Sequence, residues 1–260
     1  MTNSGSQTQA YELPLNERIR TLMRLESLFE RLHVHADGEH SADSRAALGI
    51  LLEIMAILGR GDLRSEVLKE MDRQGQTLGR LKNRPGIDHR RLESILESLE
   101  KLKRRLDASD AQVGRNLKQN EFLSALKQRT SIPGGTCGFD MPTLEFWLSR
   151  PAKVRQQQLE AWMGELDALD RCIRLLLMLL RESAAPSKAV AEKGLFQQSL
   201  DSAGSIQLLR VLVPSELDAF PEISGGKHRF TVRFLTQEDP SERPRQFEKD
   251  VSFGLVVCQL

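Results

Sequence analysis

The chain has 260 residues, of which 40% are hydrophobic and 28% charged, and its formal net charge is +1. These values are ordinary for a globular protein, and the near-zero charge excludes a global field that attracts nucleic acid or an acidic membrane. Three widely spaced cysteines fit reduced thiols better than a disulfide framework. The N-terminal segment, MTNSGSQTQAYEL, lacks the apolar core of a signal peptide. The longest apolar run, Leu175–Leu180, is too short to cross a bilayer. We expect a cytoplasmic protein.

Apolar residues recur at helical spacing up to about residue 180. Asp62 and Asp88 are placed to cap two of the helices, and Ser41 or Asp43 to cap another. The expected helices carry Ile19 to Leu32, Leu48 to Leu58, Leu63 to Met71, Leu92 to Leu106, Val113 to Gln128, and Trp147 to Leu180. The pattern predicts a helix bundle as an N-terminal domain over residues 16–186.

The pattern changes after Pro186 to short segments bounded by Gly, Pro, Asp and Ser. These segments are Gly194–Leu200, Ser205–Val213, Lys227–Leu235 and Arg245–Val257. They predict an antiparallel, β-sandwich-like domain over residues 187–260. A strand near residues 10–15 is expected to join this sheet, which would tie the N-terminus to the C-terminal domain. The expected fold class is α+β.

Histidines gather with acids between the first two expected helices. His33, His35 and His40 lie near Asp37 and Glu39, a composition that can ligate a metal. The spacing is irregular and no cysteine is near, so we interpret the stretch as a solvated interhelix loop and expect no metal.

Arg129–Pro151, RTSIPGGTCGFDMPTLEFWLSRP, contains a Pro-Gly-Gly turn. Gly134-Gly135 could cradle a phosphate in a hydrolase or transferase, but the Lys-Ser/Thr of a P-loop and the dinucleotide fingerprint spacing are missing. We interpret the turn as structural, letting Phe139 pack inside and Trp147 enter its helix. Nothing places a histidine and a third orienting group beside Cys137, so a nucleophilic cysteine is not favoured.

Arg80–Arg105 is locally basic, with nine basic and four acidic residues. Such a stripe can bind the phosphates of a nucleic acid. However, Glu97 with Lys101 and Glu100 with Arg104 can pair at i,i+4, as on an ordinary solvated helix face. Aromatic residues for base stacking are scarce here. A nucleic-acid-binding helical protein is therefore the alternative function, not the favoured one.

RFTVRF, which begins at Arg229, is the stronger candidate site. Its alternation places Phe230, Val232 and Phe234 on one strand face and Arg229, Thr231 and Arg233 on the other. Guanidinium groups bind carboxylates in a fixed geometry, which suits an acidic and partly apolar peptide. Charges also protect an exposed edge strand from aggregation. The residues alone leave both interpretations open.

Four blocks resemble the ZapD family of cytoplasmic bacterial division proteins, which bind the tubulin-like filament protein FtsZ. They are PLNERIRTLMRLE (Pro14–Glu26), RGDLRSEVLKEMDRQ (Arg60–Gln74), the Arg129–Pro151 segment above, and PEISGGKHRFTVRF (Pro221–Phe234). They stand in family order along almost the whole chain. The resemblance implies a helical domain joined to a β-domain, a homodimer, and no catalysis or cofactor.

The resemblance also implies function and site. It implies an adaptor that binds the C-terminal peptide of FtsZ in a basic pocket and bundles filaments at the mid-cell division ring, with no nucleic acid or membrane as partner. The implied tail-binding residues are Arg20, Arg24, Arg60, Arg64, Arg229, Arg233 and Lys188. Glu121 and Glu145 depart from the basic or histidine side chains of some relatives, so the pocket edge near them is expected to be less positive. We expect the dimer contact among the leucine-rich helices between Leu48 and Leu106.

Overall fold

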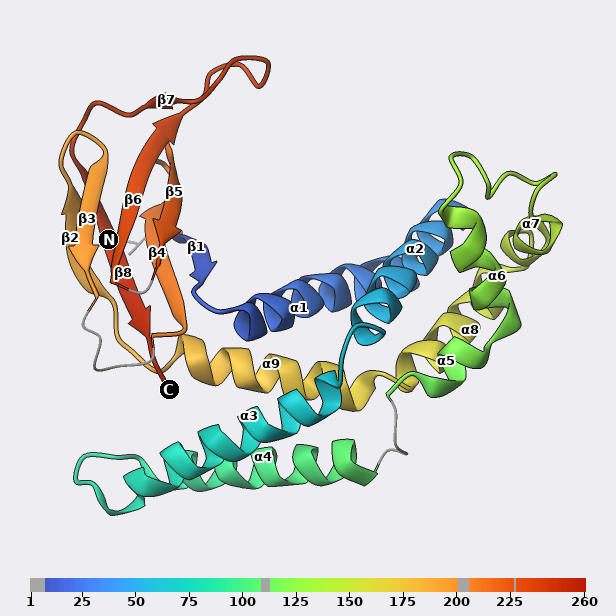
Figure 1. Cartoon of the computed structure of the whole chain (residues 1–260), viewed down its shortest axis with the longest axis horizontal. Coiled ribbons are helices and arrows are strands. Elements are labelled where there is room, and N and C mark those ends of the chain that lie inside the picture. Colours follow the sequence, from blue (N-terminus) through green and yellow to red (C-terminus); the bar gives the residue numbers. More distant parts are fainter. Residues whose placement is uncertain (1–7, 109–112, 201–205, 227) are drawn as a thin grey trace, which may run out of the picture. The chain divides into compact units, whose positions relative to one another are not determined.

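The computed structural model describes residues 8–108, 113–200, 206–226 and 228–260. They form two compact units: a helical unit, Leu22–Leu176, and a β unit made of the described residues up to Thr21 together with Leu177–Leu260. The division falls inside two helices, whereas residue 186 was the expected boundary. Helices in the first part of the chain and antiparallel sheets in the last part confirm the α+β fold class (Figure 1).

The β unit is a sandwich of two antiparallel sheets. Sheet A has the strand order β1-β4-β8-β2, and sheet B has the order β3-β6-β5 with β7 paired to the end of β6. The strands are β1 (Thr8–Pro14), β2 (Ser187–Ala191), β3 (Leu195–Ser199), β4 (Leu208–Pro214), β5 (Phe220–Gly225), β6 (Arg229–Thr236), β7 (Arg245–Gln246) and β8 (Val251–Cys258). The sequence did not predict β2 or β5, and Ser205 and Lys227, which began two expected strands, lie outside the described residues.

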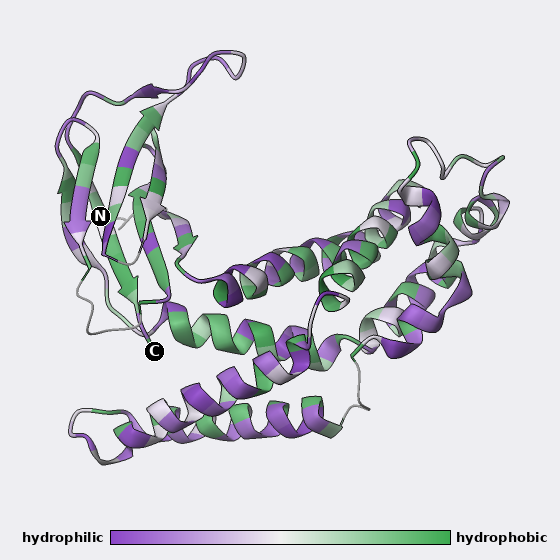
Figure 2. Ribbon diagram, viewed as in Figure 1, coloured by the Kyte–Doolittle hydropathy of each residue, from purple (hydrophilic) through white to green (hydrophobic). Residues whose placement is uncertain are grey.

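The sandwich core consists of the alternate residues that face inward from both sheets. Phe230, Val232 and Phe234 of β6 meet residues of β4 and β8. Phe253 of β8 packs against Phe234 and Phe196, with ring centroids 5.4 Å apart in each case. Figure 2 shows hydrophobic colouring along these strands. Because successive side chains point to opposite faces, the same pattern sends the polar residues of β6 outward.

The first strand completes the sheet formed by the last part of the chain. β1 pairs with β4 from Thr8 opposite Pro214 to Pro14 opposite Leu208. On the outer face of this pair, Glu12 accepts hydrogen bonds from Arg181 (Nη2 to Oε2, 2.9 Å) and Arg210 (Nε to Oε1, 2.7 Å). The three side chains are largely buried, at 14%, 24% and 22% exposure. Glu12 therefore links β1, β4 and the last residue of α9 (Asp167–Arg181).

The helical unit is built around α2 (Ser41–Leu58), of which half the residues are buried. The other helices of the described chain are α1 (Glu17–Ala36), α3 (Leu63–Gly79), the 3-10 turn η1 (Arg80–Asn83), α4 (His89–Ala108), α5 (Arg115–Gln119), α6 (Glu121–Thr130), α7 (Pro142–Leu148), α8 (Ala152–Gly164) and α9. Leu48, Leu51 and Leu106 are at most 1% exposed. These leucines pack inside the unit, and the dimer contact expected among the helices between Leu48 and Leu106 stays a prediction.

A buried arginine joins three segments of the helical unit. Arg155 of α8, only 5% exposed, donates to Ser44 Oγ (3.0 Å) and to the carbonyl oxygens of Glu39 (2.6 Å), Leu148 (3.2 Å) and Arg150. Burying a guanidinium is costly unless its donors are satisfied. The carbonyls at the start of α2 and the end of α7 supply those acceptors.

Helix boundaries follow local capping more closely than apolar spacing. Asp62 caps α3 by accepting a hydrogen bond from Ser65 N (3.1 Å). The hydrogen bonds from the Ser65 hydroxyl and from this amide lower the pKa of Asp62. The Asn120 side chain accepts a hydrogen bond from Leu123 N (3.0 Å) and so caps the start of α6. The single helix predicted over 113–128 is therefore two helices, α5 and α6. The predicted cap of α2 is wrong, because its N-cap is His40, without a side-chain bond.

The three cysteines should differ sharply toward thiol reagents. Cys137 is exposed, whereas burial raises the pKa of Cys172 to about 12 and that of Cys258 to about 11. Only thiolates react rapidly, so at pH 8 a chromogenic disulfide reagent should label one thiol per native chain, and three after denaturation. If the folded Cys137→Ala variant were still labelled rapidly, the described burial of the other two cysteines would be wrong.

Replacing Glu12 by Gln should destabilise the β unit. The substitution leaves two largely buried guanidinium groups without their carboxylate, which we expect to lower the free energy of unfolding by about 2–3 kcal/mol, after a discount for partial exposure. Urea denaturation measures the change. Glu17→Gln is the matched control, because Glu17 pairs with Arg20 at 3.7 Å with 72% exposure, and it should leave the midpoint unchanged. Equal midpoints for both variants would show that the Glu12 cluster is energetically neutral.

Candidate functional site

The outer face of sheet B carries the polar side of the RFTVRF strand. Arg229 and Arg233 are exposed, whereas Phe230, Val232 and Phe234 are at most 1% exposed, so the predicted alternation is confirmed. In register with Arg233 lie Leu195 of β3 and Glu222 of β5, and Gln197 and Ser224 flank Thr231. We call this surface the β6 face, defined by Arg229, Thr231, Arg233, Leu195, Gln197, Glu222 and Ser224.

The β6 face can bind carboxylates in an extended peptide. Four residues along a strand span about 13 Å, which is the spacing of the Cα atoms that carry its two arginine side chains. Glu222 Oε2 lies 4.0 Å from Arg233 Nη1, and both side chains are more than half exposed, so this pair is weak and open to competition. Arg229 has no ion pair with the described residues. Hydroxyl and amide groups between the arginines add hydrogen-bonding capacity, and Leu195, 38% exposed, adds an apolar contact.

Lys188 does not belong to the β6 face. It lies on β2 in sheet A, opposite Gly254. There it lines a shallow groove of about 580 Å³ with Val190, Leu212 and Gly254. The structure therefore brings Arg229 and Arg233 together and puts Lys188 on the other sheet of the sandwich.

The two arginines of α1 stand one helical turn apart. Arg20 is half-buried and donates from Nη2 to the carbonyl oxygen of Pro14 (3.3 Å), and it lies near Glu17. Arg24 is exposed and falls in the helical unit. Part of the hydrogen-bonding capacity of Arg20 thus holds the turn between β1 and α1.

Arg60 and Arg64 have different surroundings. Arg60 is exposed just after α2. Arg64 donates from Nε to Leu106 O (3.2 Å) and from Nη2 to the carbonyl and carboxylate of Asp107, both at 2.7 Å. It thereby satisfies carbonyls at the end of α4, where a cation is favourable. This contact explains Arg64 without a ligand.

The Gly134-Gly135 loop is a chain of tight turns. Gly135 N donates to Ile132 O (2.9 Å) and Cys137 N donates to Gly134 O (3.0 Å), so these amides are not free to cradle a phosphate. A Cβ on Gly135 would lie 2.5 Å from Arg129 O, which explains the glycine. The turn is structural, but Phe139 is not packed inside as we expected, because it is 85% exposed. Trp147 enters α7 as predicted, beside Phe122 and Trp162.

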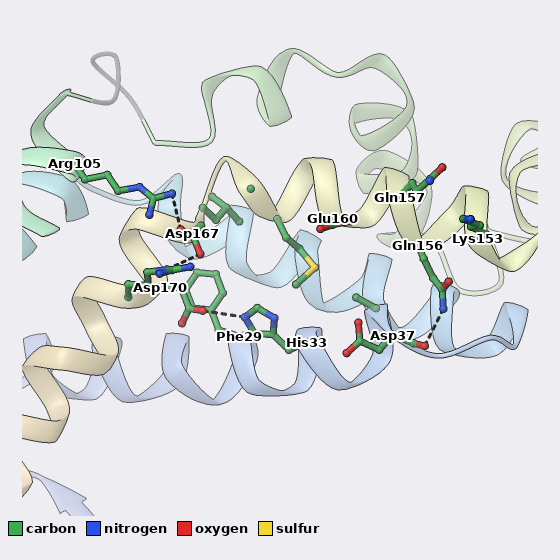
Figure 3. A pocket seen from close by; sticks show the side chains of 15 residues that line it. Phe29, His33, Asp37, Arg105, Lys153, Gln156, Gln157, Glu160, Asp167 and Asp170 are labelled. Atoms are coloured by element: carbon green, nitrogen blue, oxygen red, sulfur yellow. Dashed lines mark hydrogen bonds and ion pairs between the residues drawn. The ribbon is translucent and has the colours of Figure 1, made fainter.

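The helical unit also contains a cavity that sequence reasoning missed (Figure 3). It has a volume of about 710 Å³ and is lined by residues of α1, α4, α8 and α9. His33 Nε2 lies 3.0 Å from Asp170 Oδ2, and Arg105 Nη2 lies 2.8 Å from Asp167 Oδ2. His33 belongs to α1 rather than to a loop, so the predicted loop begins too early. No local signal could reveal a pair 137 residues apart.

The described residues contain neither a metal-binding cluster nor a membrane-spanning helix. In residues 8–108, 113–200, 206–226 and 228–260, no three His, Cys, Asp or Glu side chains lie close enough together to hold a metal ion. Within the same ranges, every helix is too short or too polar to span a bilayer.

Comparison with known proteins identifies the family. The family described as "ZapD: Cell division protein" matches residues 23–233. Cell division protein ZapD of Methylococcus capsulatus is 45% identical over 250 residues, which cover 96% of this chain and 98% of the relative. The Chromobacterium violaceum protein of the same name is 40% identical, over 96% and 99% of the two chains. The resemblance first seen in four short blocks thus extends over nearly the full length, and the chain belongs to the ZapD family of cell division proteins.

Proposed function

We propose that this protein is a non-enzymatic adaptor that binds the C-terminal tail of FtsZ through the β6 face. As a dimer with two such faces, it cross-links FtsZ filaments into bundles at the division ring in the cytoplasm. Membership of a cell division family supports the role. The observation that carries the site is the exposed pair Arg229 and Arg233 on one strand, over a core that gives them no packing role.

The chemistry of the β6 face fits an acidic and partly apolar peptide. Each arginine offers a planar fork of donors that can bind a carboxylate with two parallel bonds. The weak contact with Glu222 can be displaced, because both partners are solvated. Leu195 and the hydroxyl and amide groups beside the arginines can contact the apolar side chains and backbone of an extended segment.

The alternative, a nucleic-acid-binding protein, has less support. Its basic stripe, Arg80–Arg105, is partly neutralised by acids of the helical unit. Lys103 pairs with Asp72 (2.5 Å), Arg104 with Glu100 (3.0 Å), and Arg105 with Asp167 (2.8 Å). Phosphate binding to these cations would have to compete with those carboxylates.

Reversing both arginines, Arg229→Glu with Arg233→Glu, should abolish binding of a synthetic FtsZ tail peptide in calorimetry. Hydrogen bonds to charged groups contribute about 1.5–3 kcal/mol each, so loss of two costs at least a hundredfold in affinity. The control is Arg243→Glu with Lys249→Glu, because both side chains are exposed in the same unit and the net charge changes equally.

The thermal melt of the arginine variant should match that of the wild type, since neither side chain is part of the core. If the arginine variant binds the peptide as the wild type does, the β6 face is not the site. If the control loses affinity equally, net charge rather than the β6 face determines binding.

Lys188 gives an independent test of location. Because Lys188 lies on sheet A, Lys188→Glu should reduce affinity for the tail peptide less than threefold, by long-range electrostatics only. Fluorescence anisotropy with a labelled peptide measures this at physiological salt. A loss as large as that of the double arginine variant would move the site to the groove beside Gly254.

A further inference from the structure

The hairpin formed by α3 and α4 ends in a basic loop. Figure 1 shows the two helices side by side, with their connecting loop at the end of α3 that is away from α2. Residues 80–91 contain five arginines or lysines and one acid. That acid, Asp88, caps α4 by accepting a hydrogen bond from Arg91 N (3.1 Å). The five cations are exposed, and we call them the hairpin tip: Arg80, Lys82, Arg84, Arg90 and Arg91.

The fold does not account for the charges of the hairpin tip. Farther along the hairpin, cations are matched by acids, as Lys103 is by Asp72 at 2.5 Å. Four cations of the hairpin tip, all but Arg91, form no ion pair with the residues that the structure describes. Arg90 and Arg91 also stand in the first turn of α4, which contains no acid. The helix macrodipole is positive at that end, so cations there lower the stability of the helix. A local cost of this kind is typical of a functional surface.

A groove between the two helices continues from the hairpin tip. Its volume is about 370 Å³, and its apolar floor is formed by Met71, Leu96 and Leu99. It is open at Gly75, where an added Cβ would meet nothing within 4 Å. Lys82 of the hairpin tip also lines it. The hairpin groove, as we call this surface, therefore places apolar contacts directly beside unpaired cations.

This combination selects among anionic partners. Residues 63–108 contain no aromatic side chain on which a nucleic-acid base could stack. Within the same range, all of it described, no large apolar side chain is exposed enough to insert into a bilayer. Apolar contacts beside arginines fit a protein segment that carries both carboxylates and aliphatic side chains. A groove between two packed helices accepts such a segment as a third helix.

We propose that the hairpin groove and the hairpin tip dock an acidic amphipathic helix of a partner protein. Its aliphatic side chains pack on Leu96 and Leu99, and its carboxylates bind Arg80 and Arg84. Arginine forks hold carboxylates with two parallel bonds, which gives the contact its orientation. The two acids that line the groove, Asp72 and Glu100, are already paired with cations, so they repel the partner little. This docking site is separate from the β6 face and does not rest on the proposed function.

A synthetic helix of about 18 residues, about as long as α3, is the probe. It carries Leu on one face and Glu on the other, and fluorescence anisotropy with the full-length protein should show saturable one-to-one binding. A peptide with Lys in place of Glu should not bind, because the hairpin tip repels it. A peptide with Ser in place of Leu should bind about tenfold more weakly, because it loses the apolar contact. No binding of the Leu–Glu peptide at about 1 mM would overturn the proposal.

Charge reversal tests the hairpin tip. Arg80→Glu with Arg84→Glu should weaken binding of the Leu–Glu peptide by about tenfold or more, because attraction becomes repulsion at two positions. The control is Arg31→Glu with Arg115→Glu, since both side chains are exposed in the same unit and the net charge changes equally. The control should bind as the wild type does. An equal loss in both variants would show that net charge, not the hairpin tip, determines binding, and the proposal would fail.

Filling the groove tests its apolar part. Gly75→Leu places a side chain in the hairpin groove, so it should weaken binding of the probe about tenfold. Removing a glycine from the interior of α3 favours the helix, so the melting temperature should not fall, and a loss of affinity cannot come from unfolding. Ser98→Leu, which adds the same side chain at an exposed position of α4, should bind normally. Full affinity in the Gly75→Leu variant would rule out the groove as the docking site.

Two further ligands separate this proposal from its competitors. Duplex DNA of about 20 base pairs and vesicles of anionic phospholipid should bind more weakly than the Leu–Glu peptide. Tighter binding of either, lost in the Arg80→Glu, Arg84→Glu variant, would make the hairpin tip a phosphate-binding surface and refute the helix. The FtsZ tail peptide should bind this variant as it binds the wild type. A wild type that binds the Leu–Glu probe but not the tail peptide refutes the proposed function and leaves the docking site standing.

Discussion

The carboxylate of Glu12, held between the guanidinium groups of Arg181 and Arg210, is the interaction on which the β unit depends. Its partners lie 169 and 198 residues away in the chain. One carboxylate for two largely buried cations leaves a net positive charge, so both arginines need Glu12 in place. The strand that carries Glu12 supplies one edge of sheet A, and the other face of that strand pair covers the sandwich core. The ionic cluster and the core therefore fix the same register.

That register determines what the opposite sheet can present. Phe230, Val232 and Phe234 must all face inward to fill the space against Phe253, and this leaves Arg229 and Arg233 no direction but outward. A slip of β6 by one residue would bury both arginines and expose three core residues, at a cost that no solvent contact offsets. The candidate binding face is thus a consequence of the packing beneath it, and it needs no dedicated loop to position its charges.

Sequence reasoning succeeded where the signal is local. The period of two in RFTVRF gave the faces of β6, and side chains such as Asp62 gave a helix start. It failed where the outcome depends on distant partners. FPEISG has no clear alternation, so β5 is recognisable only by its pairing with β6. A phenylalanine in a glycine-rich turn looks the same whether it is buried or, like Phe139, exposed. Lys188 and Arg229 are both basic residues in strand-forming segments, and only the strand order shows that they lie on different sheets.

The pairing of β1 with β4 has a consequence for synthesis on the ribosome. The helical unit is one continuous segment, and all of its contacts become available once Leu176 has emerged. The first strand, by contrast, must wait until Leu208–Pro214 has been translated, and sheet A closes only when β8 follows near the C-terminus. Such non-local pairing is slow, because a long loop must close before any contact is gained. Throughout that interval the Thr8–Pro14 segment has no strand to pair with, so its backbone donors and acceptors are open to premature association.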